Sequence, residues 1–287
     1  MTLPTMVEGL SRDDLLAWCE RIDVGPFSTV AAGERIAFQN QECLVMLAAA
    51  AALTRRIRVF ATVFVLPMHD PVWLAKQVAT LDVLSRGRFV LGVGAGAREE
   101  DYRSVGASFA QRHARMADAV ATLRRTWQGE PPFPGADPVG PRPLQAGGPP
   151  ILVGTLAPRA IARAASWADG LAGFSLGPDT TEIERGFRAA RDAWRAAGRS
   201  APPRLVTSFW YALGPRAREQ LDAYVERYLR IFGPAAVAGA QRAAAAASPE
   251  AVREALSRIR EAGGDEVILV PTGAGLDQLD RLRDVLG

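Results

Sequence analysis

Apolar runs alternate with amphipathic segments along this chain, and the alternation predicts an α/β fold. Residues 57–66 are rich in Val, Ile and Phe without a strict apolar-polar alternation, which is typical of a strand buried on both faces of a parallel sheet. Asp70 can then cap a helix whose first residue is Pro71, and apolar residues follow at helical spacing. Residues 88–94 are a second apolar run. Together they predict a right-handed βαβ unit.

The same alternation recurs eight times and predicts a (β/α)8 TIM barrel in a single domain over residues 1–287. The expected strands are residues 2–7, 27–33, 57–66, 88–94, 151–154, 170–175, 205–213 and 267–271. A Pro/Gly-rich excursion, residues 129–150, follows the fourth βα unit, and a helical insertion from residue 215 precedes the eighth strand. Residues 129–150 could alternatively link two domains, but the strands before them cannot close a barrel alone.

Composition excludes several classes of protein. The net charge of +3 is too small to indicate nucleic-acid binding, and the longest apolar run, residues 43–53, is too short to span a bilayer. No secretory signal is evident. Cys19 and Cys43 lack metal-ligand spacing and are expected to be buried thiols in a reducing compartment. We therefore expect a cytoplasmic protein with no metal and no membrane or nucleic-acid partner.

One predicted helix, residues 41–54, is apolar on almost every side. A helix of that kind is buried on more than one face. On the outside of a barrel, its outer face needs a second surface to cover it. The sequence therefore predicts a homodimer.

Two ionisable residues follow predicted strands, where TIM barrels place their functional groups. Glu34 ends the second strand, and its carboxylate is a candidate functional group at the barrel mouth, unless it only pairs with Arg35. His69 follows the third strand and can exchange protons near neutral pH, unless it only hydrogen-bonds its own backbone. The second histidine, His113, lies in a predicted helix and is expected to be structural.

Two loops are candidate ligand sites. Gly94, Ala95, Gly96 and Ala97 leave the backbone almost bare, so that a flat ligand can lie against it; the GxGxG spacing does not match a dinucleotide fingerprint. Tight packing alone is the alternative explanation of these glycines. Gly154, Thr155, Leu156 and Ala157 precede a predicted helix, where free N–H groups, the helix dipole and a hydroxyl favour a phosphate. An ordinary capped helix is the alternative there.

Several ordered stretches resemble the bacterial-luciferase-like family of flavin- and deazaflavin-dependent oxidoreductases. The matching residues are 56–59, 66–82, 84–96 and 99–115; the similarity is fainter at the N-terminus and returns at 149–170 and 248–270. The resemblance implies a TIM barrel that binds FMN or the deazaflavin coenzyme (F-420) at its open face. It also implies a non-proline cis peptide at Thr62-Val63 beneath the cofactor ring.

The family pattern is changed at two positions that bear on the cofactor. Ala95 stands where some members have a phosphate-contacting arginine, and Arg98 stands where others have an aromatic residue. The missing arginine favours the deazaflavin coenzyme, whose acidic tail Arg98 and Arg159 can meet near the barrel mouth.

The resemblance implies hydride transfer or monooxygenation of a small organic substrate. A phosphate-binding lyase or isomerase without a redox cofactor is one alternative, although the only lysine, Lys76, lies in a predicted helix. A non-catalytic cofactor-binding barrel is the other, because a signature histidine of the family is missing.

Overall fold

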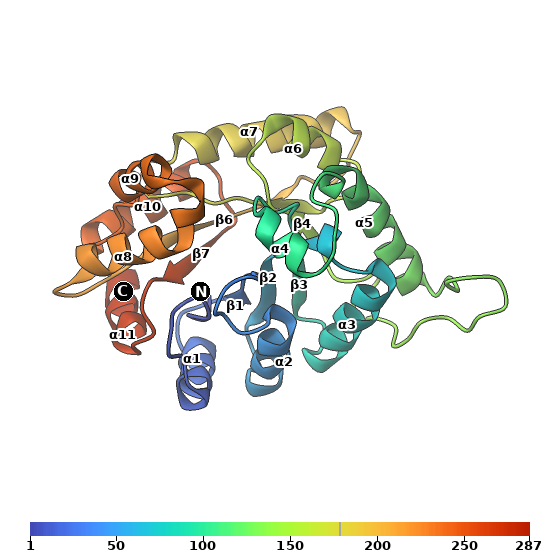
Figure 1. Cartoon of the computed structure of the whole chain (residues 1–287), viewed down its shortest axis with the longest axis horizontal. Coiled ribbons are helices and arrows are strands. Elements are labelled where there is room, and N and C mark those ends of the chain that lie inside the picture. Colours follow the sequence, from blue (N-terminus) through green and yellow to red (C-terminus); the bar gives the residue numbers. More distant parts are fainter. Residues whose placement is uncertain (178) are drawn as a thin grey trace.

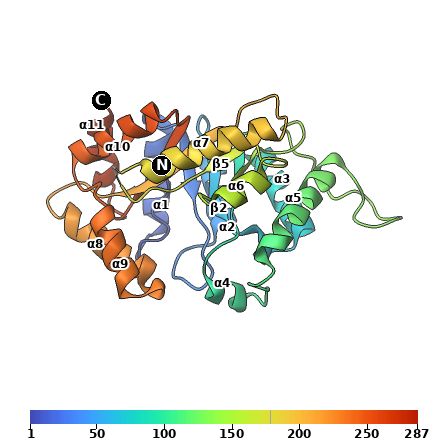
Figure 2. The same cartoon turned by 90° about the horizontal axis from the view of Figure 1, so that it is seen from above.

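The computed structural model describes residues 1–177 and 179–287, which form a nearly closed barrel of seven parallel strands surrounded by helices (Figures 1 and 2). The strands pair in sequence order. They are β1 (Thr29–Ala32), β2 (Arg58–Phe64), β3 (Phe89–Val93), β4 (Ile151–Val153), β5 (Gly170–Ala172), β6 (Arg204–Tyr211) and β7 (Glu266–Pro271). The predicted TIM-barrel class is confirmed.

Helices follow the strands around the outside of the barrel (Figure 1). They are α1 (Arg12–Val24), α2 (Cys43–Leu53), η1 (Leu66–Met68), α3 (Pro71–Leu84), α4 (Glu99–Ser104), α5 (Arg112–Gln128), α6 (Pro158–Ala164), α7 (Thr181–Ala196), α8 (Ala217–Leu229), η2 (Arg230–Phe232), α9 (Pro234–Ala243), α10 (Pro249–Glu261) and α11 (Asp277–Leu286). No helix of the described residues is long and apolar enough to cross a membrane.

The N-terminal segment occupies the place of the eighth strand. The backbone N–H of Thr2 donates to the carbonyl of Leu269 in β7 (2.9 Å), and Thr2 forms a parallel bridge with Ala31 in β1. The predicted strand over residues 2–7 is wrong beyond this bridge. Pro4 has no N–H to donate to a sheet, and the chain turns after it.

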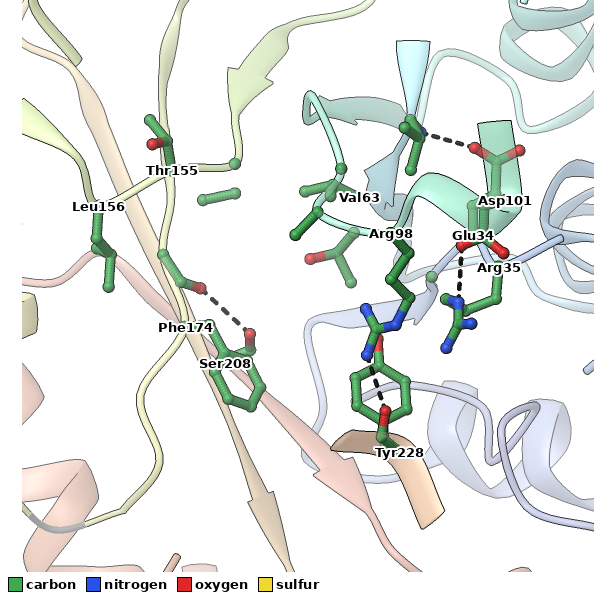
Figure 3. A pocket seen from close by; sticks show the side chains of 18 of the residues that line it. Glu34, Arg35, Val63, Arg98, Asp101, Thr155, Leu156, Phe174, Ser208 and Tyr228 are labelled. Atoms are coloured by element: carbon green, nitrogen blue, oxygen red, sulfur yellow. Dashed lines mark hydrogen bonds and ion pairs between the residues drawn. The ribbon is translucent and has the colours of Figure 1, made fainter. Parts of the chain in front are cut away.

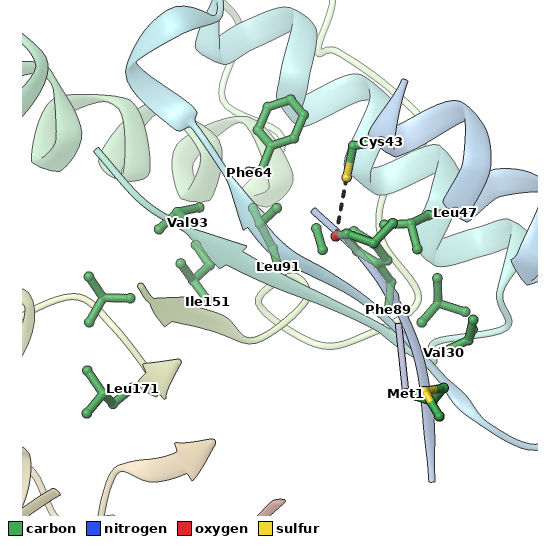
Figure 4. Packing of buried hydrophobic residues seen from close by; sticks show 14 of the residues in the cluster. Met1, Val30, Cys43, Leu47, Phe64, Phe89, Leu91, Val93, Ile151 and Leu171 are labelled. Carbon is green, nitrogen blue, oxygen red and sulfur yellow. Dashed lines mark hydrogen bonds between the residues drawn. The ribbon is translucent and has the colours of Figure 1, made fainter. Parts of the chain in front are cut away.

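Both faces of the sheet are buried, which explains why the strands lack a polar-apolar alternation. Each strand directs one residue of a central cluster into the barrel, namely Ala31, Phe60, Val90, Leu152, Ala172, Val206 and Ile268. Alternate residues such as Phe89 and Leu91 pack outward, in one cluster with Cys43 and Leu47 of α2 (Figure 4). Both cysteines are buried free thiols, as predicted.

The two interruptions lie where the sequence predicts them. Residues 129–150 contain no helix or strand, and the carboxylate of Asp82 in α3 accepts hydrogen bonds from the backbone N–H groups of Leu144 and Gln145 (2.8 and 3.0 Å). α8, η2 and α9 form the second insertion. The excursion is thus tied to the barrel, and we propose that residues 1–287 form one domain.

Candidate functional site

A groove of three connected compartments lies at the carboxyl ends of the strands. A central compartment of about 450 Å³ lies between a basic compartment of about 560 Å³ and an aromatic chamber of about 460 Å³. The central compartment shares Val63, Gly96 and Thr155 with the basic compartment. It shares Thr62 and Arg98 with the aromatic chamber. A ligand can therefore extend from one compartment into the next.

The Thr62–Val63 peptide bond at the centre of the groove is cis, which confirms the expected geometry. The register of β2 against β3 is regular up to Ala61 and resumes at Phe64. Residues 62 and 63 therefore leave the ladder, and both line the central compartment.

Glycines surround Val63 because there is no space for a side chain. A Cβ atom at Gly154 would lie 2.5 Å from Val63 Cγ1, and one at Gly94 would lie 2.8 Å from Val63 Cγ2. Gly96 has a positive φ of 66°, which favours glycine. Close packing is therefore one role of these glycines, as the alternative explanation from the sequence proposed. Gly94 and Gly154 both pack against Val63, which belongs to the cis peptide.

The two predicted catalytic residues contact each other. Glu34 Oε1 lies 2.9 Å from His69 Nε2, and Glu34 Oε2 accepts the backbone N–H of Val65 (2.7 Å). His69 also stacks on Phe64, with ring centroids 4.3 Å apart. Glu34 lines the central compartment, whereas His69 is behind it and lines none of the three compartments. The alternative in which His69 hydrogen-bonds only its own backbone is wrong.

Arg35 is paired elsewhere, so the alternative of a Glu34–Arg35 pair is also wrong. Its Nε donates to Asp101 (2.8 Å) and its Nη2 to Glu100 (3.0 Å), which joins the loop after β1 to α4. In the same helix the hydroxyl of Tyr102 donates to the carbonyl of Ala95 (2.6 Å). Burial raises the pKa of Tyr102 to about 12, so the hydroxyl keeps its proton and holds the small-residue loop in place.

The loop at residues 154–157 offers fewer free donors than the sequence predicts. The N–H of Ala157 donates to Thr155 Oγ1 (3.2 Å), and the N–H of Ala160 donates to the carbonyl of Ala157 (2.9 Å). α6 begins at Pro158, which has no N–H, and ends at Ala164. The argument from a helix terminus is therefore weak, and Ala157 lines none of the three compartments.

One side chain, the guanidinium of Arg163, supplies the positive charge of the basic compartment instead. Arg163 of α6 and His113 of α5 line it together with Thr155 and Ser166. Burial and the positive charges of Arg112 and Arg163 lower the pKa of His113. His113 was expected to be structural, and its place in the groove depends on how α5 packs against α6. The sequence alone does not show that packing.

The aromatic chamber is the part of the groove that sequence reasoning missed. Trp210 of β6 lies at its centre, with ring centroids 4.7 Å from Phe174, 5.6 Å from Tyr224 and 5.5 Å from Tyr228. Tyr224 and Tyr228 come from α8, in the insertion before β7. Their spacing of four residues places them on one helix face and is the only signal that the sequence offered.

The described residues of the groove include neither a lysine for a Schiff base nor a cluster of metal ligands. Lys76 Nζ donates to the carbonyl of Gly140 (2.8 Å) and lines none of the three compartments, so no Schiff-base lysine is at hand. Within residues 1–177 and 179–287, no group of three or more His, Cys, Asp or Glu side chains is arranged to hold a metal ion.

Comparison with known proteins gives consistent matches over the whole barrel. The family model of luciferase-like monooxygenases matches residues 4–270. The crystal structure of monooxygenase RslO1 from Streptomyces bottropensis is similar at a TM-score of 0.81 and 25% identity, and the match covers 100% of this chain and 96% of RslO1.

Two further structures share the fold at lower identity. An F420-dependent secondary alcohol dehydrogenase in complex with an F420-acetone adduct matches at a TM-score of 0.81 and 17% identity, over 99% of this chain and 97% of its own. The oxygenating constituent of 3,6-diketocamphane monooxygenase from the CAM plasmid of Pseudomonas putida, in complex with FMN, matches at a TM-score of 0.70 and 18% identity. This match covers 99% of this chain and 94% of that structure.

Proposed function

Because the chain belongs to the family of luciferase-like monooxygenases, we propose that it is an oxidoreductase that binds the deazaflavin coenzyme or FMN and acts on a small organic substrate. The observation that carries the proposal is the row of three adjacent compartments, which leads from a basic one past Thr62 and Val63 to an aromatic one. A bound cofactor of this type would supply hydride transfer or oxygen-dependent chemistry. The two fold neighbours with F420 and FMN support this choice.

The residues around the cis peptide fit a flat ring. Thr62 and Val63 would contact one side of the ring, and the loop Gly94–Ala97 would allow its edge to approach the backbone. Leu156 adds an apolar contact in the central compartment. Planar ligands are held by such largely apolar walls with few polar groups. The site therefore suits an isoalloxazine or deazaflavin ring.

The basic compartment fits the phosphate of the cofactor. Thr155 supplies a hydroxyl, Gly154 a bare backbone, and Arg163 a guanidinium, which pairs strongly with phosphate. Both cofactors carry a phosphate. The Gly94–Ala97 loop holds no bulky side chain in the way of a long acidic tail, and Ala95 supplies no phosphate-binding arginine. We propose the deazaflavin coenzyme ahead of FMN for these reasons.

Glu34 is proposed to contact the substrate, and His69 to position Glu34. Only Glu34 lines the central compartment, next to the cis peptide. Its second oxygen is held by the N–H of Val65, so the carboxylate is fixed in direction. His69 Nε2 lies 2.9 Å from the other carboxylate oxygen without a well-formed hydrogen bond, so the imidazole limits where the carboxylate can move.

Titration of each oxidised cofactor into the protein, followed by fluorescence, tests the proposal, and mass spectrometry identifies whatever cofactor copurifies. Thr155→Glu should weaken binding by about 1–3 kcal/mol, because a carboxylate then faces the phosphate. Thr80→Glu on the exposed side of α3 is the matched control. Equal dissociation constants for Thr155→Glu and the wild type would place the phosphate elsewhere. Absence of binding by either cofactor would contradict the proposed function.

A further inference from the structure

The aromatic chamber contains very little charge for its size. Its walls are mostly aromatic and aliphatic side chains, including Phe174, Trp210 and Tyr224. Among the described residues that line it, only Arg98 and Glu182 carry charged side chains. Glu182 is exposed at the start of α7, whereas Arg98 lies at the boundary with the central compartment.

Arg98 has no carboxylate partner within the described part of the chain. Its Nη2 donates to the backbone carbonyl of Tyr228 (2.9 Å), and the guanidinium lies 4.5 Å from the centroid of the Tyr228 ring and 5.1 Å from that of Phe232. Its Nη1 donates to no described residue, and its Nε is buried without a partner. Figure 3 shows the side chain extending through the pocket toward Tyr228.

The neighbouring Arg35 shows that the unpaired state of Arg98 is particular to this position. Arg35 contacts the same Tyr228 ring at 5.8 Å, but Asp101 and Glu100 neutralise it. Burial lowers the pKa of Arg98, yet a guanidinium in a protein stays protonated. Arg98 is therefore a partly desolvated positive charge, stabilised by aromatic rings and without an anion.

A second polar group in the chamber also lacks a partner. Thr2 is 6% exposed and lines the aromatic chamber, and its Oγ1 atom is buried without a hydrogen bond among the described residues. Buried hydroxyls are normally hydrogen-bonded. Thr2 belongs to the segment that closes the barrel, far in sequence from Arg98, so the two observations are independent.

We propose that the aromatic chamber binds a planar, mostly apolar substrate that carries one anionic oxygen group, and that Arg98 receives this group. A carboxylate or phenolate can accept from the free Nη1 and add a charge-assisted hydrogen bond. Stacking on Trp210 and its aromatic neighbours would hold the planar body. The sequence assigns Arg98 to the cofactor, and this inference assigns it to the substrate. It rests on the proposed function, because the chamber adjoins the compartment proposed for the cofactor ring.

Calorimetric titration with three naphthalene probes tests the inference without turnover. The probes are 2-naphthoate, neutral 2-naphthamide and cationic 2-naphthylmethylamine. The wild type should bind naphthoate at least about tenfold more tightly than naphthamide, and the cation most weakly. Arg98→Met should abolish the difference between naphthoate and naphthamide, whereas Arg98→Lys should keep part of it. Arg103→Met is the matched control, because it removes an equal charge from the exposed side of α4.

The outcomes separate this inference from the proposed function. Equal binding of naphthoate and naphthamide by the wild type, or an unchanged preference in a folded Arg98→Met protein, would overturn it. So would an Arg98→Met protein that loses cofactor affinity and keeps the naphthoate preference, because Arg98 would then belong to the cofactor. A wild type that prefers naphthoate but binds neither cofactor would uphold the inference and contradict the oxidoreductase.

Discussion

Two buried charged residues, Glu266 at one end of the barrel and Arg98 at the other, have different partners. At the amino-terminal end, Glu266 of β7 pairs with Arg58 (3.2 Å) and Arg204 (2.5 Å). It also accepts hydrogen bonds from the hydroxyls of Ser28 and Thr29. At the carboxyl end, Arg98 has only a backbone carbonyl and two rings. In TIM barrels the first end serves stability and the second serves function. The unpaired Arg98 lies at the second end, beside Arg35, which is paired with Asp101 and Glu100.

Asp23 repeats the pattern at the amino-terminal end. Its carboxylate accepts the backbone N–H groups of Arg55, Arg56 and Ile57, at 2.9, 3.0 and 3.2 Å. These bonds fix the start of β2 to the end of α1. This carboxylate serves the backbone of the barrel and not a ligand, so the comparison predicts that changes at this end alter folding and leave binding intact.

The largest expected effect is the pH dependence that Glu266 imposes on stability. Burial alone would raise the pKa of Glu266, but the hydroxyls of Ser28 and Thr29 and the two guanidinium groups outweigh it and lower the pKa from 4.5 to about 2. A group with a depressed native pKa stabilises the fold above its unfolded pKa, and this stability is lost as the pH falls from about 5 to 2. The loss should be about 3 kcal/mol at most.

Urea unfolding of the wild type and Glu266→Gln at several pH values between 7 and 2 measures this loss. The stability difference between the two proteins should shrink as the pH falls, because protonation makes the wild type resemble the variant. Cofactor affinity at pH 7 should be the same for both. A stability difference that is independent of pH would contradict the assignment, and a loss of cofactor binding in the folded variant would break the comparison between the two ends.

At the carboxyl end, Gly154→Ala should lower cofactor affinity in addition to stability. The new Cβ would lie 2.5 Å from Val63 Cγ1, so Val63 and the cis peptide must shift. Overpacking of this kind costs about 1–3 kcal/mol of stability, and cofactor affinity should fall more than tenfold. Gly239→Ala in α9 is the control, since nothing lies within 4 Å of its added Cβ. Unchanged cofactor affinity in Gly154→Ala would show that the cis peptide is not part of the cofactor site.

A smaller effect on stability is expected for His69→Phe. The new ring can keep the stacking on Phe64 but loses the contact with Glu34, at a cost of about 1 kcal/mol. Glu34 would keep the bond from Val65 and its place in the cavity. If His69 positions Glu34, the pH profile of turnover should shift while the dissociation constant of the cofactor stays the same. An unshifted profile would show that the imidazole has no part in the reaction.

The parts of the site predicted from the sequence are those built by local structure. The apolar runs at residues 57–66 and 88–94 correspond to Arg58–Phe64 and Phe89–Val93, because hydrophobicity and turn residues determine such strands locally. Small residues after β3 likewise marked one wall of the groove. The contact of Glu34 with His69 depends on how two neighbouring loops are placed in the fold. Rules for residue propensity and spacing cannot predict the distance between two loops.

The aromatic chamber was missed for a different physical reason. Its walls combine Thr2, Trp210 and Tyr228, which come from the closing segment, a central strand and an insertion. Each of these residues alone looks like ordinary core or surface. Their convergence depends on long-range packing of the insertion, which local propensity and periodicity do not determine. The unpaired state of Arg98 was hidden in the same way, because one of 34 basic residues does not stand out by type.

The smallest effect on folding and on ligand binding is expected at the outer face of α2, where an apolar surface is open to solvent. Val45 is 67% exposed, and Leu53 of the same helix and Leu84 of the adjacent α3 are exposed as well. We propose that a second copy of the chain covers this face, because several large apolar side chains are exposed on two helices that pack together. Val45→Asp should change monomer stability by less than about 0.5 kcal/mol. It should also convert the dimer into a monomer in light scattering, whereas Asp192→Ala on α7 should leave the mass unchanged. A wild type that is already monomeric at micromolar concentration would refute the interface. A dimeric Val45→Asp protein would move the contact to another face.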